Sequence, residues 1–344
     1  MIAILGGGIS GLSIAYGLKK AGKEFMLLEA NSEVGGKIKS EQRNGFTLEM
    51  GPNTVLINNA EVKGLLNELD LEQELIFANS QAVKNRQVLV NGEIVSLPSG
   101  PKDLFGNKLL SFRSLFKILN EPFVGTRIEF EDEEESLASF VRRRLGNEIY
   151  ENFIYPFVTG IYAGDPEQMS MDYTLKVLKE AEQRHGSILK GMLKILKEKK
   201  RKNAALKLPK QKIFTFQSGL QRLTDRMHES MYDEIICEAR IDRVIRTQRG
   251  YMLVYWKDDE IVKKEVSQVI SCLPAFRLAS VVNWNTEFSE ALKAVHYVPA
   301  LVSHFALKTK LKRKPSFGIL TREKESAPFL GVLFNSHFFP HTAP

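Results

Sequence analysis

Cysteine is scarce in this sequence of 344 residues, which contains Cys237 and Cys272 and no others. Two separate thiols provide neither a disulfide framework nor a paired metal site, so we expect a reducing compartment. No apolar run reaches about 18 residues, the length that a membrane-spanning helix requires. The six histidines are scattered, and neither a Ser/His/Asp nor a Cys/His arrangement is visible. These absences argue against a disulfide scaffold, a transmembrane protein and a nucleophilic triad.

The charge balance limits which binding partners we expect for this protein. The chain has 48 basic and 41 acidic residues, a net charge of +7, with 43% hydrophobic and 26% charged residues. This balance is typical of a folded chain, and the length suffices for two domains of about 100–200 residues. The basic excess permits an anionic ligand or an acidic membrane surface. It is too small and too dispersed to indicate nucleic acid, so we expect none as a partner.

The first residues predict a βαβ unit. Residues 2–5 form a short apolar run that is typical of a buried parallel strand. A glycine turn follows, with Gly6, Gly8 and Gly11 in the order G-x-G-x-x-G, and helical spacing then continues to Gly22. A second apolar run, residues 25–28, ends at Glu29. The order of strand, glycine turn, helix, strand and acid predicts a dinucleotide site.

Each part of this unit has a chemical reason. Gly6 permits the tight turn, Gly8 lets the backbone approach a pyrophosphate, and Gly11 lets helix and strand pack closely. The helix N-terminus, with Ile9 and Ser10, offers free N–H groups to the phosphates. The carboxylate of Glu29 can accept hydrogen bonds from ribose hydroxyls and would repel a 2′-phosphate.

The next residues indicate which dinucleotide binds. Glu29-Ala30 leads into Gly35-Gly36-Lys37, and this stretch resembles the opening signature of the FAD-dependent amine-oxidase and protoporphyrinogen-oxidase superfamily. The resemblance implies FAD, with the second glycine pair and Lys37 along its diphosphate. From the residues alone, this turn is either a second anion cradle or a solvated turn.

The rest of the chain divides by its pattern. Residues 60–71 predict a helix, and Asn91-Gly92 predicts the turn of a hairpin over 88–97. Residues 102–205 have helical periodicity, with an acidic run at 131–136 that we interpret as a solvated helix start. The basic amphipathic helix at 188–202 would either lie on an anionic membrane or cover a core as an ordinary surface helix. After Pro209 the pattern becomes β-rich.

Further segments resemble protoporphyrinogen oxidase in particular. The quoted segments are Gly51-Pro52-Asn53-Thr54, Asn85-Arg86, Phe140 to Gly164 with the turn Gly160-Ile161-Tyr162-Ala163-Gly164, Phe317 to Leu320, Leu330 to Phe334 and Phe339-Pro340. The resemblance places the first of these beside the flavin and Ile241 near the adenine. It makes Arg86 a ligand of a substrate propionate, where the residue alone would suggest a surface salt bridge. It assigns Gly160 and Ile161 to the substrate site, and gives Leu320 and Phe339 faces for a tetrapyrrole.

The resemblance also implies an architecture. We expect an α/β protein with a Rossmann-type FAD-binding domain, an inserted, mainly helical domain and a substrate domain, as in amine oxidases. The expected boundaries are 1–58 for the FAD-binding part, 59–101 for the start of the substrate domain, 102–205 for the helical and membrane-associated domain, 206–285 for the return of the FAD-binding domain, and 286–344 for the substrate domain. The family continues into a further segment that returns to the flavin, so we expect this chain, which stops at Pro344, to be impaired.

The expected function is FAD-dependent oxidation of protoporphyrinogen IX to protoporphyrin IX in haem biosynthesis, with oxygen as acceptor. Coproporphyrinogen III oxidation, another FAD-dependent amine or polyene oxidase, and a catalytically silent fragment are the alternatives. No catalytic acid or base and no metal ligand can be assigned, because the flavin supplies the chemistry. The expected location is the cytoplasm, with peripheral contact to the inner face of the membrane and a homodimer left open.

Overall fold

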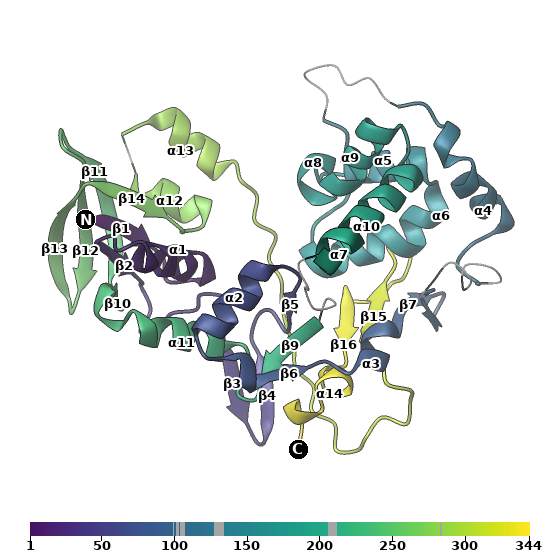
Figure 1. Cartoon of the computed structure of the whole chain (residues 1–344), viewed down its shortest axis with the longest axis horizontal. Coiled ribbons are helices and arrows are strands. Elements are labelled where there is room, and N and C mark those ends of the chain that lie inside the picture. The colour runs from purple at the N-terminus through teal and green to yellow at the C-terminus, as the bar shows by residue number, and fades with distance from the viewer. Residues whose placement is uncertain (99, 101–102, 104–106, 127–133, 206–211, 283) are drawn as a thin grey trace.

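The computed structural model describes all residues except 99, 101–102, 104–106, 127–133, 206–211 and 283. Figure 1 shows two lobes side by side, joined along their lower ends by short sheets. One lobe contains the N-terminus and most of the long β-strands, and the other is helical. The described part of the chain contains no helix that is both long and apolar enough to cross a membrane.

The N-terminal lobe is built on a parallel sheet with the strand order β10-β2-β1-β14. These strands are Ile235–Ile236, Phe25–Leu28, Ile2–Leu5 and Gln268–Ser271. All of β2 is buried, as an apolar strand covered on both faces should be. Helix α1 (Ile9–Lys20) packs on one face through Leu12 and Ala15. The expected strand, glycine turn, helix and strand are therefore confirmed.

A second, antiparallel sheet packs against the face of the parallel sheet that lies opposite α1. Its strands are β11 (Arg240–Arg246), β12 (Tyr251–Lys257) and β13 (Glu260–Val266), followed after β14 by helices α12 (Ala275–Val281) and α13 (Thr286–Lys293). Leu292 of α13 packs on the same core as Leu5 and Leu28. Residues 286–293, expected in the substrate domain, therefore pack with the N-terminal lobe, because Leu292 finds its apolar partners there. The domain boundaries as a whole stay a prediction.

The helical lobe comprises α4 (Phe112–Leu119), η3 (Glu121–Phe123), α5 (Leu137–Arg144), α6 (Asn147–Ile149), η4 (Tyr150–Ile154), α7 (Tyr155–Tyr162), α8 (Met171–Thr174), α9 (Lys176–His185) and α10 (Ile188–Ala205). The hydrophobic core of this lobe includes Phe140, Tyr150, Val158 and Ile188. The expected helical periodicity of this region is thus confirmed. The segment η4 is a π-helix, a form that often marks functional sites.

The acidic run at 131–136 is not simply a solvated helix start. Residues 131–133 lie outside the described residues, but Glu135 is 4% exposed. Its carboxylate pairs with Arg143, which also pairs with Glu182 at 2.8 Å. The interpretation was wrong for Glu135 because a partner on the following helix compensates its buried charge.

Short sheets and helices join the two lobes. These elements are β3 (Ser40–Arg43), β4 (Phe46–Glu49), β5 (Val55–Ile57), α2 (Ala60–Glu68), η1 (Glu72–Glu74), β6 (Leu75–Phe77), α3 (Ser80–Lys84), β9 (Lys212–Phe216), α11 (Gln221–Ser230), η5 (Tyr232–Glu234), α14 (Asn335–Phe338) and η6 (Pro340–Thr342). Strand β9 lies between β5 and β6. A chain that has passed through the helical lobe thus returns between two earlier strands.

The last sheet connects distant parts of the sequence. Its order is β16-β15-β7-β8, with strands Gly331–Leu333, Gly318–Thr321, Arg86–Val90 and Glu93–Ser96. The expected hairpin is confirmed, with Asn91 and Gly92 at φ values of 51° and 79° in its turn. Strand β15 runs parallel to β7, so the sheet carries two of the segments predicted for the substrate.

Candidate functional site

Two glycine turns face each other at the end of β1. The amide of Gly35 donates to the carbonyl of Gly7 at 2.8 Å, and Gly8 and Gly35 form an isolated parallel bridge. A Cβ atom added to Gly36 would lie 3.0 Å from the Cα atom of Gly8. The turns predicted to flank the diphosphate are therefore in contact, and their close approach depends on the absence of a side chain at Gly36.

The N-terminus of α1 opens beside these turns. Its N-cap is Gly8, which contributes no side chain, and no acidic residue lies in the first turn. The amides of Ile9, Ser10 and Gly11 precede the first intrahelical bond, from Leu12 to Gly8. Free amides and the helix dipole make this end suitable for an anion such as a diphosphate. The predicted residues thus lie together.

Gly11 has a structural role that can be separated from binding. A Cβ atom at this position would lie 2.0 Å from the carbonyl oxygen of Gly6, which is a clash with backbone. The helix could not then approach the strand. Gly11 therefore sets how closely α1 packs on β1, as the motif predicts.

Glu29 ends β2 with a buried carboxylate that is 6% exposed. One oxygen accepts from the amide of Gly7 at 2.7 Å, and the other accepts from the backbone and side-chain nitrogens of Asn31 at 2.9 and 2.7 Å. A carboxylate has about four acceptor positions, so these three bonds orient it and leave capacity for a hydroxyl. Asn31 was missed in the sequence, although its place two residues after Glu29 is typical of an Asx contact. Ala30, between them, is exposed.

The segment Gly51-Pro52-Asn53-Thr54 reaches the second glycine turn. A Cβ atom on Gly51 would lie 2.0 Å from the carbonyl oxygen of Lys37. The side chain of Asn53 donates to the carbonyl of Gly51 at 3.3 Å and accepts from Asn335 at 3.0 Å. Two predicted cofactor segments are therefore adjacent, and Asn335 ties them to the part of the chain that follows β16. The cofactor roles of Pro52, Asn53 and Thr54 stay predictions.

Helix α11 packs against the second glycine turn at Gly35. A Cβ atom on Gly35 would lie 3.0 Å from Oγ1 of Thr224. The start of the helix is held by Glu49, which accepts from the amide of Leu220 at 2.8 Å and from the Ser40 hydroxyl at 2.6 Å. Burial raises the pKa of Glu49 above its ordinary value. The sequence contains no signal for these contacts, because Glu49 and Leu220 lie in segments with no common motif.

Ile241 lies close to Glu29 through the backbone. The amide of Ala239 donates to the carbonyl of Glu29 at 2.8 Å, and Ile241 follows in β11. The side chain of Ile241 is 5% exposed and belongs to the core of the N-terminal lobe. Its role near the adenine stays a prediction, and it would involve the edge of this segment rather than an exposed side chain.

Arg86 stands at the start of β7, opposite Gly318 of β15. Among the residues that the structure describes, no carboxylate pairs with its guanidinium, which lies 5.6 Å from the centre of the Phe317 ring. The alternative of a surface salt bridge is therefore not found in the described part of the chain. An exposed guanidinium beside an aromatic face suits a carboxylate attached to an apolar molecule.

Helix α7 meets β15 at Gly160. A Cβ atom on Gly160 would lie 2.5 Å from Cδ2 of Leu320, so the two residues are in close contact. Ile161, the next residue, is 58% exposed. The helix ends at Ala163 with φ of 54°, a left-handed value that is uncommon for a residue other than glycine. The structure thus brings three predicted substrate residues, Gly160, Ile161 and Leu320, to one junction.

Phe339 occupies a different environment. It is 2% exposed and packs in a small core with Ala82 and Phe338. Its ring is 5.0 Å from that of Phe338. In this arrangement the residue supports the sheet below the predicted substrate site and presents no free face. Its contact with a tetrapyrrole stays a prediction.

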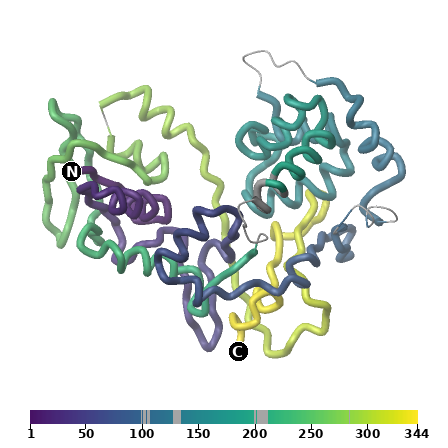
Figure 2. Tube along the Cα trace, in the orientation of Figure 1, coloured from purple at the N-terminus to yellow at the C-terminus, as the bar shows by residue number. Residues whose placement is uncertain are grey.

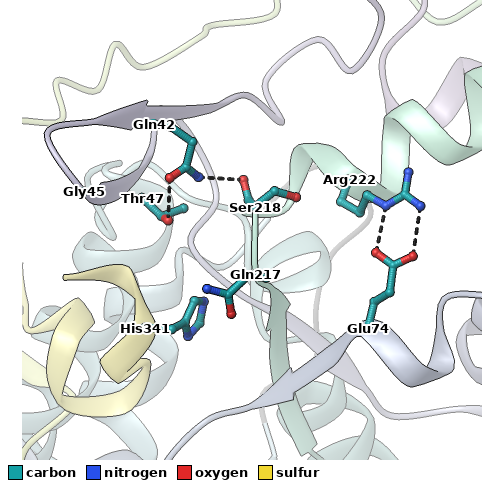
Figure 3. Close-up of a pocket in the computed structure, with 8 residues that line it drawn as sticks. All are labelled: Gln42, Gly45, Thr47, Glu74, Gln217, Ser218, Arg222 and His341. Carbon is teal, nitrogen blue, oxygen red and sulfur yellow. Dashed lines mark hydrogen bonds and ion pairs between the residues drawn. The ribbon is translucent and has the colours of Figure 1, made fainter. Parts of the chain in front are cut away.

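A polar cavity of about 380 Å³ lies at the base of the molecule, apart from both groups of residues. Figure 3 shows its lining, which includes Gln42, Gln217 and His341. Arg222 is held there by Glu74 through bonds of 2.8 and 2.9 Å. Because its charges are already paired and no predicted residue lines it, we assign no function to this cavity.

The parallel sheet, the two glycine turns (Gly6 to Gly11 and Gly35 to Gly36, together called the glycine cradle) and the acid after β2 are the features of a dinucleotide-binding fold. Residues 9–344 match the family described as flavin containing amine oxidoreductase, and the chain belongs to this family. FAD is its cofactor.

Several known proteins with similar sequences are porphyrinogen oxidases. Protoporphyrinogen oxidase 2, chloroplastic/mitochondrial, of Arabidopsis thaliana is 31% identical over 100% of this chain and 72% of that protein. Coproporphyrinogen III oxidase of Staphylococcus aureus is 32% identical over 74% of this chain and 57% of that protein. A solved Exiguobacterium protein, provisionally assigned as a protoporphyrinogen oxidase, has the same fold, with a TM-score of 0.74 at 22% identity over 100% of this chain and 74% of its own. The chain is therefore shorter than each of these relatives.

The residues of the glycine cradle fit an FAD molecule. Gly8 and Gly36 leave the space between the turns free of side chains, the start of α1 presents its amides, and Glu29 is oriented beside them. These groups would hold the diphosphate and the ribose. FAD held there would supply hydride-accepting redox chemistry to the site.

Proposed function

We propose that the enzyme to which this chain belongs oxidises protoporphyrinogen IX to protoporphyrin IX. Coproporphyrinogen III is the alternative substrate, because relatives of both kinds are about equally similar to this chain. The two substrates share an apolar macrocycle that carries propionates and differ in how many propionates they carry. The role in haem biosynthesis follows from either substrate.

One observation carries the proposal: β15 brings the predicted substrate residues together. Leu320 of this strand contacts Gly160 of α7, and Gly318 pairs with Arg86 of β7. An apolar junction on β15 thus lies next to a strand, β7, whose first residue offers a guanidinium without a carboxylate partner among the described residues. An apolar ring with a propionate needs both kinds of group. Leu320 and Ile161 would contact the macrocycle, and Arg86 would bind a propionate through its planar fork.

The test begins with the purified chain and its flavin spectrum, since a protein without FAD would support the catalytically silent alternative. Each porphyrinogen is then supplied separately, and porphyrin fluorescence and oxygen uptake are followed. Arg86→Ala should lower kcat/KM roughly 10–100-fold, because a hydrogen bond to a charged group contributes about 1.5–3 kcal/mol. Arg86→Lys keeps the charge and should lose less.

The substrate assignment fails if neither porphyrinogen is oxidised by a form of the protein that retains FAD. An unchanged kcat/KM in Arg86→Ala would contradict the role of Arg86 alone. Lys84→Ala, an exposed cation two residues away in α3, is the matched control and should leave both measurements unchanged.

We also propose that the helical lobe binds an anionic membrane surface through α4. Phe112, Phe116 and Leu119 lie on one face of this helix and are 89%, 69% and 68% exposed. Phe123, just beyond it, is 84% exposed. Such a row of exposed aromatic and aliphatic side chains suits insertion into the region of lipid head groups. In α10, Ile188 is buried whereas Leu193 and Leu196 are exposed, so this helix both covers the core and adds apolar surface.

Vesicle flotation tests this surface. The chain should float with vesicles of anionic and zwitterionic lipid, and Phe112→Ser with Phe116→Ser should abolish flotation, because the inserted apolar area is lost. Tyr173→Ser, in α8 of the same lobe and 87% exposed, is the matched control and should still float. Equal flotation of the double variant and the wild type would contradict the proposal.

A second copy of the chain is the other partner that we propose. Residues 295–317, between α13 and β15, form neither helix nor strand, and Figure 2 shows them descending from α13 between the lobes and then looping along the base of the molecule before β15. Leu301, Phe305 and Leu307 of this segment are 93%, 85% and 56% exposed. An extended segment with exposed apolar side chains offers both backbone and apolar contacts to a second chain.

A further inference from the structure

Arg322 connects three elements of the predicted substrate site. It follows β15 directly, and its side chain is 11% exposed. Its Nη1 atom donates to Oδ1 of Asn152 in η4 at 3.0 Å, and its Nη2 atom donates to Oδ1 of Asn91 at 2.9 Å. One guanidinium thus joins the end of β15, the π-helix and the turn between β7 and β8.

Glu325 completes this arrangement. Its carboxylate is 8% exposed and pairs with Arg322 at 2.6 Å. It also accepts from the backbone amides of Asn91 at 2.7 Å and Gly92 at 3.3 Å. The charge of Arg322 is therefore compensated by a residue that itself holds the hairpin turn. We refer to Arg322, Glu325, Asn91 and Asn152 as the Arg322 cluster.

Each element that the cluster joins carries a predicted substrate residue. Arg86 begins β7, and Leu320 lies two residues before Arg322 in β15. Gly160 and Ile161 belong to α7, which continues directly from η4. Asn152 is itself anchored, since its side-chain nitrogen donates to the carbonyl of Leu109 at 2.7 Å. The cluster therefore determines how these three elements are placed relative to one another.

We propose that Arg322 and Glu325 are positioning residues for the porphyrinogen, an inference that rests on the proposed function. They set the spacing between the guanidinium of Arg86 and the apolar junction of Gly160 with Leu320, without contacting the substrate. The planar fork of arginine makes separate bonds to Asn152, Asn91 and Glu325, a geometry that the single ammonium of lysine cannot reproduce. Loss of the cluster should therefore affect porphyrin binding and spare FAD binding in the other lobe.

The experiment measures the binding of protoporphyrin IX and coproporphyrin III by fluorescence quenching, together with FAD content and thermal unfolding. Arg322→Met should raise the Kd for porphyrin about tenfold, with FAD content unchanged. Arg322→Lys should restore binding only in part. Asn91→Gly removes one partner while keeping a residue that suits the left-handed turn, so it should fold and give an intermediate Kd.

Lys324→Met is the matched control. Lys324 lies in the same loop and pairs with Glu151 of the same π-helix at 2.9 Å, but its side chain is 65% exposed. This variant should keep the Kd of the wild type, because an exposed pair contributes little.

The possible outcomes separate this inference from the proposed function. A wild type that binds neither porphyrin contradicts the proposed function, and the positioning role with it. A wild type that binds porphyrin, with the same Kd in Arg322→Met and Asn91→Gly, overturns the positioning role alone. A parallel loss of FAD and porphyrin in Arg322→Met would show a general structural role and would also overturn it.

Discussion

At the scale of single residues, the glycines of the cradle have different tasks. Gly11 is required for packing, since a Cβ atom there would lie 2.0 Å from the oxygen of Gly6. Gly8 is not, because its φ of −70° suits any residue and the nearest atom to an added Cβ atom is 3.9 Å away. Packing therefore does not require glycine at this position, which agrees with the predicted role of Gly8 in binding a diphosphate. Folding and cofactor binding can be separated within one motif.

We expect Gly8→Ala to fold with nearly unchanged stability and to lose FAD affinity by at least about tenfold, because its methyl group occupies the place of the diphosphate. Gly11→Ala should instead lower the free energy of unfolding by roughly 1–3 kcal/mol, through the clash with backbone. FAD content after purification and chemical unfolding of the apoprotein measure the two effects.

Gly17→Ala is the control for both variants. It lies in the same helix, and an added Cβ atom would meet no atom within 4 Å. It should increase the free energy of unfolding by about 0.5–1 kcal/mol, as alanine does in a helix interior, and leave FAD binding intact. Retention of FAD by Gly8→Ala would contradict the assignment of the cradle.

At the scale of elements, a buried ion pair fixes the start of α10. Glu121 and Arg144 are both fully buried and in direct contact. Glu121 also accepts from the Ser187 hydroxyl at 2.6 Å and from the amides of Ile188 and Leu189 at 2.9 and 3.2 Å. The carboxylate thus caps the helix and compensates a cation on α5. Through this pair, η3, α5 and α10 form one unit.

This unit should make stability depend on pH. Burial by itself raises the pKa of Glu121, but the hydrogen bonds from Ser187 and the two amides, with the charge of Arg144, leave it below the ordinary value of 4.5. The unfolded state therefore takes up the proton first as the pH falls. The contribution of the Glu121 carboxylate to the free energy of unfolding is therefore complete above pH 4.5 and is lost progressively below it.

We expect Glu121→Gln to lower the free energy of unfolding at pH 7 by roughly 3 kcal/mol, because Arg144 loses its nearer carboxylate and keeps only Glu182, at 3.4 Å. The difference from the wild type should shrink as the pH falls below 4.5. Denaturant unfolding over a pH series measures both. Glu180→Gln, whose exposed pair with Arg184 spans 3.6 Å, should cost under about 1 kcal/mol. A constant difference across the pH series would show that the carboxylate charge is not the cause.

The sequence predicts elements that follow from local pattern. The βαβ unit and the hairpin at Asn91-Gly92 could each be recognised from a few adjacent residues. The contacts that could not be predicted join residues far apart, such as Glu49 with Leu220 and Arg322 with Asn152. Local propensity carries no information about these pairs, since only the packing of separate elements determines them.

At the scale of the whole molecule, the segment at 295–317 carries exposed apolar side chains. Several contacts fix this segment to the rest, among them the His304 ring, which lies 3.1 Å from the carbonyl of Glu49, and the bond from Arg313 to Gln87. Ser316 is buried, whereas Leu301 and Phe305 are 93% and 85% exposed. Exposed apolar surface of this kind favours association.

We expect the purified chain to associate as its concentration rises, and Leu301→Ser with Phe305→Ser to reduce association without changing stability by more than about 0.5 kcal/mol, because both residues are already exposed. Sedimentation velocity over a concentration series measures the association. Tyr173→Ser is the control for loss of an exposed aromatic ring. A wild type that stays monomeric at every concentration would contradict the proposed homodimer.

The pairing of β1 with β14 joins strands that are far apart in the sequence. Ile2 lies opposite Gln268, so the central strand of the cradle gains its second neighbour only when nearly the whole lobe has been synthesised. The helical lobe is built from residues that are near in sequence and can form earlier, since contacts between distant residues are the slow ones. We therefore expect the parallel sheet to gain its pairing between β1 and β14 after the helical lobe has formed.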